Sequence, residues 1–415
     1  MNWLNRKELA WCESSDLHAN MKRLFIVSSY PAKNQLHGTN TVGVASYTKN
    51  TLKALTGFHK DLRITVWAET LEKEEVYREN GMIIKRVWKR GDYNSLWSLY
   101  KAISDRPSDA VIVPFEGYMV GGLSHTLLFV YMMLLWKLSG KKIYLILHQV
   151  VADFRPFEKN QLKAFVLNII KSFFYPTLLY ISFKTIVFEK KFKELLKNNE
   201  KVVVISHAVE TMKKISKTEA RKKLKLKKNG FYVLCFGYIS PYKGMDSMIA
   251  LWEKYKNVHL IIGGGPNPNH NNKRSYAKFV AALKKKAREK GIITTGFISE
   301  KKIPLYFSAC DLVVLPYKTF MSSSGPLSIA FSFEKPVLLS RALEGYFDSP
   351  DFQKSLRLNP VTKNNLVFKL NKEDFFDKLK WTRKNLEKTV AFSKSMKETR
   401  SWEKIGKKYV QVLSQ

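Results

Sequence analysis

The stretch "FYVLCFGYISPYKGMDSMIALW", residues 231–252, decides the fold of this chain. It opens with a continuous apolar run that is typical of a strand buried on both faces. The run ends at Gly237, a short turn follows, and a helical pattern begins after Lys243 and Gly244. A buried strand followed at once by a helix is the repeating unit of a parallel sheet. The stretch therefore predicts an α/β domain whose functional edge lies at the end of this strand.

The same alternation of strand and helix recurs along most of the sequence. From residue 231 onward, the apolar β-rich runs are 231–237, 258–265, 292–297, 311–317 and 336–340. An earlier series comprises 23–29, 62–68, 109–114, 142–147, 184–188 and 201–205. Two series in 415 residues, joined by the lysine-rich stretch 207–228, predict two doubly wound, Rossmann-like parallel-sheet domains. We expect the ligand in the cleft between them, at the carboxyl ends of the strands.

Domain boundaries and compartment follow from local composition. Residues 1–20 are polar and mixed in charge, without the pattern of a secretory signal, and we expect them to form an extension. The first domain is then expected over 21–210 and the second over 211–392.

Cys235 and Cys310 lie in apolar, strand-like runs. This favours buried thiols in a reducing compartment, and we expect a cytoplasmic protein.

The charge balance is strongly positive. Lys and Arg total 71 against 35 for Asp and Glu, a formal net charge of +36. Such a surface attracts nucleic acid, anionic lipid headgroups or phosphorylated substrates, although a generally basic proteome would give the same balance. Basic and aromatic residues are not interleaved in the way typical of RNA-binding proteins, so the sequence argues against nucleic acid as a partner.

Two apolar segments bear on membrane contact. The run Leu127–Trp136 has ten residues, half of what a bilayer span needs, and we expect a buried helix there. The segment 159–183 is apolar and aromatic and contains Lys159, Lys163 and Lys171. It fits a helix that lies on the inner face of the cell membrane, with these lysines near the headgroups. An internal helix packed on the sheet fits equally well.

Candidate ligand-binding residues lie at the strand ends. Gly237 permits close backbone approach, and Lys243 would place a positive charge at the start of the next helix. After the run 311–317, Ser323, Ser324 and Gly325 precede a proline at the start of a helix. Their backbone amides suit a phosphate. The alternatives are an ordinary turn with an exposed lysine and an ordinary capped helix.

The first half of the chain offers fewer candidates. Gly43 stands just before an amphipathic helix, and His148 follows the apolar run 142–147 directly. A histidine in that position faces the cleft and is suited to hydrogen bonding or proton transfer. The sequence has no Asp-x-Asp, Walker loop, GxGxxG after the first strand or GxSxG. These absences argue against P-loop nucleotidases, simple Rossmann dehydrogenases and α/β-hydrolases, and against a metal–diphosphate site.

The strand-end loops together resemble glycosyltransferase family 4, which has the GT-B fold. The resemblance covers roughly residues 21–415 and rests on five stretches in the family's order. "FGYISPYKG" resembles "GRLSPEKG", "LIIGGGP" resembles "LVIVGDGP", and "EKPVLLS" resembles "GKPVVAS". "GFISEKKIPLYFSACDLVVLP" and "SWEKIGKKYVQVL" are similar to two further motifs. The last of these implies that residues 393–415 form a helix that crosses back to the first domain.

The resemblance implies an activity and a set of roles. The activity is retaining transfer of a sugar from a nucleotide-diphosphate sugar, of UDP or GDP type, with no metal or other cofactor. Lys243 would neutralise the diphosphate leaving group, His148 would contact the donor sugar, and Gly43 would lie near the donor phosphate. The amides of the donor loop would come from Ser324, Gly325 and Leu327. With the apolar segment and the charge, a lipid-linked or saccharide acceptor is expected.

Three departures from the family pattern leave an alternative open. Tyr238 stands where the family has an arginine, and Met321 and Ile329 stand where it has two glutamates. Some branches of the family carry a Ser/Gly-rich loop in place of these glutamates, as this chain does. The alternative is a catalytically silent subunit of the same fold that binds a partner or a membrane.

Overall fold

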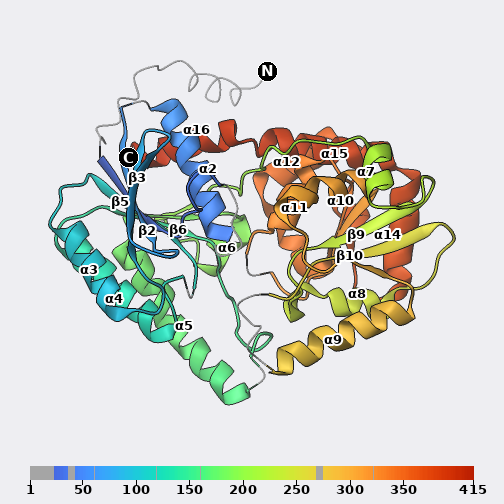
Figure 1. Cartoon of the computed structure of the whole chain (residues 1–415), viewed down its shortest axis with the longest axis horizontal. Helices are drawn as coiled ribbons and strands as arrows, with labels where there is room; N and C mark the ends of the chain where they lie inside the picture. The colour runs from blue at the N-terminus through green and yellow to red at the C-terminus, as the bar shows by residue number, and fades with distance from the viewer. Residues whose placement is uncertain are drawn as a thin grey trace, which may run out of the picture.

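The computed structural model describes residues 23–35, 43–59, 61–117, 119–158, 160–267, 274–320 and 322–415. The predicted extension 1–20, Lys159 and Met321 lie outside these ranges. Two α/β domains stand side by side, and the end of the chain returns from the second domain to the first (Figure 1). The two predicted doubly wound domains are therefore present.

The first domain is built on an eight-stranded sheet of order β3-β4-β2-β1-β5-β6-β7-β8. Its strands are β1 (Arg23–Ser28), β2 (Arg63–Glu69), β3 (Glu75–Glu79), β4 (Met82–Trp88), β5 (Ala110–Phe115), β6 (Ile143–Leu147), β7 (Lys184–Val187) and β8 (Val202–Val204). All pairs are parallel except β3 with β4. The sequence did not predict this hairpin, whose turn residues Asn80 and Gly81 both have positive φ, as a tight hairpin turn requires.

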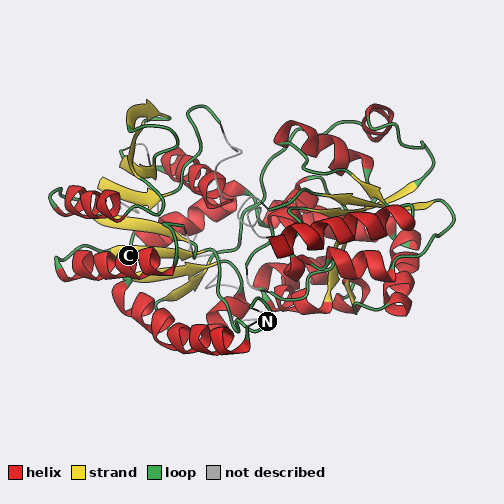
Figure 2. Cartoon of the chain, turned by 60° about the horizontal axis from the view of Figure 1, so that its bottom comes forward, coloured by secondary structure: helices red, strands yellow, loops and turns green. Residues whose placement is uncertain are grey.

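Helices cover both faces of this sheet (Figure 2). They are α2 (Gly43–Phe58), α3 (Tyr93–Ser104), α4 (Leu123–Leu138), α5 (Gln161–Ile181) and α6 (Lys190–Leu195). Alternate residues of β1 point to opposite faces, as the strand period requires. Phe25 packs with residues of α3, α4 and α5, while Leu24 packs with residues of α2.

The second domain has a six-stranded, wholly parallel sheet of order β11-β10-β9-β12-β13-β14. The strands are β9 (Phe231–Phe236), β10 (Val258–Gly263), β11 (Ile293–Thr294), β12 (Leu312–Leu315), β13 (Val337–Ser340) and β14 (Val367–Phe368). Its helices are α7 (Lys217–Lys223), η1 (Pro241–Lys243), α8 (Met245–Leu251), α9 (Arg274–Glu289), α10 (Ile303–Ala309), α11 (Gly325–Ser332), α12 (Pro350–Leu358), α13 (Lys363–Leu366), α14 (Lys372–Lys384) and α15 (Leu386–Thr399). Cys235 and Cys310 are buried free thiols, as predicted.

The chain crosses between the domains at Arg400. Helix α15 packs on α11 and α12 in the second domain, whereas α16 (Trp402–Leu413) packs on α2 in the first. A side chain at Gly406 would lie 2.9 Å from the ring of Phe58, so this glycine permits the close approach of α16 to α2. The segment 393–415 is thus two helices, of which only the second returns to the first domain.

Helices α4 and α5 have unusual apolar exposure. In α4, Phe129 and Trp136 are buried, but Leu127 is 46% exposed, so the expected buried helix is buried on one face only. In α5 only Ala164, Leu178 and Ile181 are buried. Its exposed apolar and aromatic residues are Leu162, Phe165, Val166, Ile169, Phe173 and Tyr180. Among the described residues, α5 is the one helix long and apolar enough to cross a membrane, by length and composition only.

Candidate active site

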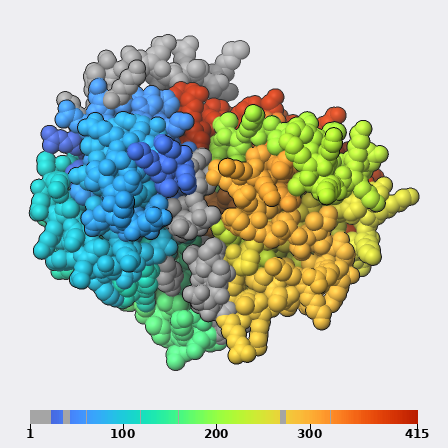
Figure 3. Space-filling view, viewed as in Figure 1, coloured from blue at the N-terminus to red at the C-terminus, as the bar shows by residue number. Residues whose placement is uncertain are grey.

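The carboxyl ends of the two sheets face each other, since segments that follow their strands are in contact. Gln149, just beyond β6, forms an isolated β-bridge with Ser322 in the loop before α11. The ring of Phe157 lies 6.2 Å from that of Tyr242 in η1. In the space-filling view the first domain, in blue to green, and the second, in yellow-green to orange, form two lobes side by side (Figure 3).

Gly237 and Lys243 come together at the end of β9. Gly237 has φ +121°, a backbone conformation that residues with a side chain rarely adopt. A Cβ there would lie 2.8 Å from Nζ of Lys243 and 3.3 Å from Cγ of Pro326, in the first turn of α11. Glycine therefore permits the lysine and this helix N-terminus to lie against one strand end.

Lys243 is the cation of this site. Burial lowers its pKa to about 8, because a low-dielectric environment disfavours the charged ammonium. The described residues include no acidic partner that forms an ion pair with it. Among the described residues the side chain therefore has no counter-charge, and it lies beside a helix N-terminus that also favours anions.

The N-terminus of α11 is only partly available to a ligand. Ser324 caps the helix, and its Oγ accepts from the Leu327 amide at 3.3 Å. The Ser324 amide itself donates to the hydroxyl of Tyr346 at 2.8 Å. Gly325 is exposed, and nothing lies within 4 Å of the position of a Cβ there. Of these three predicted amide donors, Gly325 alone makes no hydrogen bond with a described residue.

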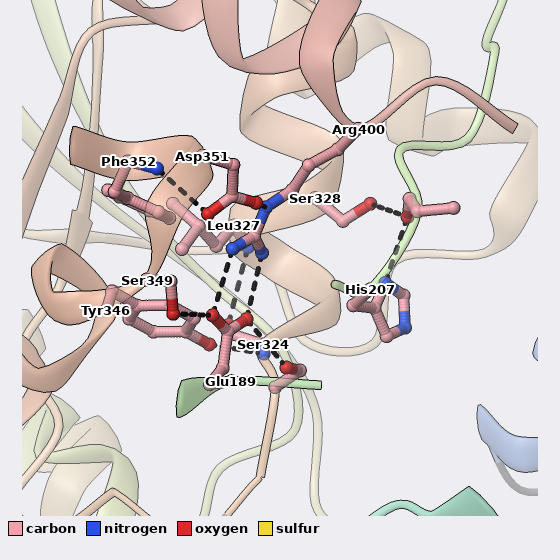
Figure 4. Close-up of polar contacts among 12 residues, drawn as sticks. Glu189, His207, Ser324, Leu327, Ser328, Tyr346, Ser349, Asp351, Phe352 and Arg400 are labelled. Carbon is pink, nitrogen blue, oxygen red and sulfur yellow. Dashed lines mark hydrogen bonds and ion pairs between the residues drawn. The ribbon is translucent and has the colours of Figure 1, made fainter. Parts of the chain in front are cut away.

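Ser323 connects the same loop to a buried ion-pair network at the domain junction. Its Oγ donates to Glu189, which follows β7 in the first domain, at 3.1 Å. Arg400 donates to both carboxylate oxygens of Glu189 at 2.9 Å and to Asp351 of the second domain at 2.6 Å (Figure 4). Burial acts to lower the pKa of Arg400, but the charges and hydrogen bonds of Asp351 and Glu189 together outweigh it and raise that pKa, so Arg400 stays charged. The crossover arginine thus connects both domains to the candidate donor loop.

His148 lies in an aromatic cluster on the first-domain side. Its ring is 5.2 Å from that of Tyr47 in α2 and 5.0 Å from that of Phe188, both edge-to-face. Burial, and next the nearby His207, lower its pKa to about 3, so the ring is neutral at ordinary pH. Its Nε2 is buried and has no partner among the described residues. This suits hydrogen bonding to a ligand rather than proton transfer.

Gly43 is the exposed first residue of α2. Residues 36–42, which precede it, lie outside the described ranges. The described start of the loop is anchored by Arg86, which is buried and donates to the backbone oxygens of Tyr30 and Pro31. Glu79 accepts from the Asn34 amide at 2.7 Å. The hairpin β3–β4 thus holds Tyr30, Pro31 and Asn34 in place.

Sequence reasoning missed a carboxylate in this cleft. Glu116 directly follows β5, and its Oε1 accepts from Nε2 of Gln149 at 2.6 Å. Burial raises its pKa to about 7, and the opposing charge of Arg90 is not enough to offset this. The available signal was its place at a strand end, the same signal that identified His148. No group of three or more His, Cys, Asp and Glu side chains that could hold a metal occurs among the described residues.

Tyr238, at the position of the family's arginine, is stacked on another aromatic ring. It packs against Phe297 with 5.9 Å between ring centroids and 18° between ring planes. Both rings are exposed, and Tyr238 is next to Gly237. The position therefore offers an aromatic surface in place of a cation.

Comparison with known proteins agrees with this architecture. Residues 216–348 match the family model described as "Glycosyl transferases group 1". Two curated proteins of Xanthomonas campestris, each named GDP-mannose:glycolipid 4-beta-D-mannosyltransferase, are 33% identical over 106 residues. The match covers 26% of this chain and spans only 29% of the length of those relatives.

Solved structures match almost the whole chain. Sucrose-phosphate synthase from Thermosynechococcus elongatus has a TM-score of 0.70 at 14% identity, over 94% of this chain and 98% of that one. The Anabaena protein HepE, in complex with UDP and glucose, has a TM-score of 0.62 at 13% identity, over 95% and 99%. The structure of trehalose-6-phosphate from E. coli, bound with UDP-2-fluoro glucose, has a TM-score of 0.64 at 12% identity, over 95% and 99%. At sequence identities of 12–14%, the structural similarity shows the fold alone. The chain has the GT-B fold, and its second domain contains a segment that matches glycosyl transferases group 1.

Proposed function

We propose that this protein transfers a sugar from a nucleotide-diphosphate sugar to a lipid-linked or saccharide acceptor. The observation that carries the proposal is the anion site at the end of β9. There Lys243, with no acidic ion-pair partner among the described residues, lies against Gly237 and the N-terminus of α11. The match of residues 216–348 to a glycosyltransferase model supports the same activity.

The chemistry follows from where charge develops. Breaking the bond between the sugar and the diphosphate leaves negative charge on the phosphate. Lys243 and the Gly325 amide offer positive charge and a hydrogen bond to such an oxygen, in a partly buried site where electrostatic stabilisation is strong. These groups perform the charge neutralisation that a metal performs in other transferases, so we propose transfer without a required metal.

Stereochemistry depends on where the acceptor's proton goes. If the departing phosphate takes it, acceptor and leaving group share one face of the sugar, and the anomeric configuration is retained. That outcome is the one implied by the resemblance to glycosyltransferase family 4, and it suits a site in which the protein supplies no base.

The nucleotide base is expected near Tyr238. Its exposed stack with Phe297, next to Gly237, offers a surface on which a planar base can pack. The relatives named above include a protein that uses GDP-mannose and structures that hold UDP. We therefore propose a UDP- or GDP-linked donor.

A lipid-linked acceptor is proposed from the exposed apolar residues of α5. A helix with this exposure fits the headgroup region of a membrane, which makes the protein peripheral on the cytoplasmic face. The lysines of this segment contribute less to electrostatic attraction toward the membrane than their number suggests. Lys163 pairs with Glu158, and Lys171 donates to the Ala152 backbone oxygen. Apolar burial would therefore dominate the attraction.

A catalytically silent subunit of the same fold remains the second candidate. It is favoured by Tyr238 at the arginine position and by the engagement of the Ser324 and Leu327 amides within the protein. The two candidates differ in turnover, since a silent subunit binds without releasing nucleoside diphosphate.

A thermal-shift screen tests the proposal. A ligand that binds only the folded protein raises its unfolding temperature. We expect a rise with UDP, GDP or one of their sugar conjugates, and none with the corresponding nucleosides, which lack the diphosphate. No shift with any nucleotide, together with tight, salt-sensitive RNA binding, would overturn the proposal in favour of a nucleic-acid protein.

A further inference from the structure

Glu189 is a buried carboxylate of the first domain that binds side chains from outside that domain (Figure 4). Its Oε1 accepts from Ser323 at 3.1 Å and from Arg400 at 2.9 Å. Its Oε2 accepts from Ser349 at 2.9 Å and from Arg400 at 2.9 Å. The two serines belong to the second domain, and Arg400 lies at the crossover between the domains. One carboxylate of the first domain therefore holds three side chains at the domain junction.

Ser323 is the donor-loop residue of this group. It directly precedes Ser324, the cap of α11, and Gly325, whose amide makes no hydrogen bond with a described residue. The Ser324 amide donates to the Tyr346 hydroxyl at 2.8 Å, and the ring of Tyr346 lies 6.0 Å from the guanidinium carbon of Arg400. The junction thus holds two successive residues of the loop, just before the amide that is available to a ligand.

The helix that follows the loop is attached to the same junction. Ser328 of α11 donates to the backbone oxygen of Ala208 at 3.0 Å. The next residue, Val209, donates from its amide to the backbone oxygen of Arg400 at 2.8 Å and forms an isolated β-bridge with Ser401. The chain passes between the domains in both of these paired segments. The loop and its helix are therefore both fixed where the domains meet.

We propose that Glu189 is a positioning residue of the donor loop and acts on the nucleotide through Ser323. The proposal rests on the proposed function. Glu189 holds the loop, before the donor arrives, in the conformation that leaves the Gly325 amide available to the diphosphate. A loop that is already ordered loses less conformational freedom on binding, which strengthens the complex. Donor affinity then depends on a residue of the first domain as well as on the second domain.

A direct contact between Ser323 and the donor is the competing explanation. A serine hydroxyl has one proton, and in Ser323 that proton is directed to Glu189. It is therefore not available to a phosphate oxygen while the contact with Glu189 persists. The two explanations differ in what happens when Glu189 is changed, because only positioning makes the effect of Ser323 depend on Glu189.

The first test compares Ser323→Ala with Ser349→Ala. Each change removes one hydrogen bond to Glu189, and each leaves the ion pair of Glu189 with Arg400 in place. Titration calorimetry with UDP and with GDP measures the dissociation constant, and thermal unfolding measures stability. Because a hydrogen bond to a charged group changes an equilibrium constant by about tenfold or more, we expect Ser323→Ala to raise the dissociation constant at least about fivefold. Ser349→Ala should bind within about twofold of wild type, although its unfolding temperature falls.

The second test compares Glu189→Gln with Asp351→Asn. Both carboxylates are buried and pair with Arg400, so each change removes one ion pair and should lower the unfolding temperature. Glu189 holds Ser323, whereas Asp351 accepts from the amide of its neighbour Phe352, so Glu189→Gln alone should weaken nucleotide binding.

A double-mutant cycle completes the second test. Removal of the Ser323 hydroxyl should cost less affinity in Glu189→Gln than in the wild type, because the hydroxyl acts through this carboxylate. Glu189→Asp, which keeps the charge but shortens the side chain, replaces Glu189→Gln in the cycle if that variant does not fold.

Three results would overturn the inference. They are equal nucleotide affinity in Ser323→Ala and Ser349→Ala, equal nucleotide affinity in Glu189→Gln and Asp351→Asn, and an effect of Ser323→Ala that is the same with and without the change at Glu189. The last result would assign Ser323 to direct contact with the phosphate. Wild-type protein that binds neither UDP nor GDP and transfers no sugar would instead overturn the proposed function itself.

Discussion

At the residue scale, Lys243 is the group on which the proposed donor site depends. Replacing it with alanine removes the positive charge beside Gly237, and a charge-assisted hydrogen bond contributes about 1.5–3 kcal/mol. We expect donor turnover to fall at least about tenfold in Lys243→Ala. Nucleoside diphosphate release measures this, with Lys256→Ala, an exposed lysine of the same domain, as control. Turnover equal to that of the control variant would show that Lys243 does not contact the diphosphate.

The pKa of Lys243 makes a second prediction at this scale. Because burial lowers that pKa to about 8, the free protein loses the charge as pH rises through 8. UDP or GDP prefers the charged form, so its affinity should be full below pH 8 and decline above it, with proton uptake on binding. Titration calorimetry over this range measures both effects. Lys243→Arg stays charged and should show no decline, and a wild type equally insensitive to pH would contradict the assignment.

At the element scale, α5 is the part of the fold that burial does not explain. Its exposed Phe165 and Phe173 would enter a membrane, and burying one such side chain contributes about 1.5–3 kcal/mol. We expect Phe165→Asn/Phe173→Asn to lower vesicle binding at least about tenfold in flotation assays. The control is Leu358→Asn, an exposed apolar residue of α12 in the second domain.

Vesicle composition separates apolar insertion from charge attraction. Because Lys163 and Lys171 are already engaged, binding should depend modestly on the fraction of anionic lipid. Changing both to glutamate should reduce this dependence without abolishing binding. If the double asparagine variant floats as well as the wild type, α5 does not contact the membrane.

The predictions from sequence agree best with the structure where all the residues of a strand or helix share one hydrophobic pattern. The run 231–237 predicted β9 because a parallel strand buried on both faces reads as continuous apolar sequence. The hairpin β3–β4 was missed because "EVYRE" is an edge strand that exposes Glu75, Val76 and Arg78 and so lacks a continuous apolar run. Glu116 was missed because a single carboxylate after a strand matches no motif. Its hydrogen-bond partner Gln149 comes from another element, the loop after β6.

At the scale of the whole molecule, Arg400 connects the two domains. It is 3% exposed and lies between Glu189 of the first domain and Asp351 of the second. Arg400→Leu would leave two buried carboxylates without a cation, and breaking such a pair costs about 3–5 kcal/mol. We expect calorimetry to show a clearly lower unfolding temperature for Arg400→Leu than for the wild type. Arg357→Leu, an exposed arginine of α12, is the control. A loss no larger than that of the control would mean that this network does not hold the domains together.

The central claim is that the cleft between the two domains transfers sugar from a nucleotide-diphosphate donor. Mass spectrometry of the acceptor tests it most directly, after incubation with UDP-glucose, UDP-galactose, UDP-N-acetylglucosamine or GDP-mannose and octyl glucoside. We predict an acceptor heavier by one sugar with at least one donor, and loss of this product in Lys243→Ala. An acceptor of unchanged mass with every donor, from protein whose unfolding temperature no nucleotide raises, would contradict the claim.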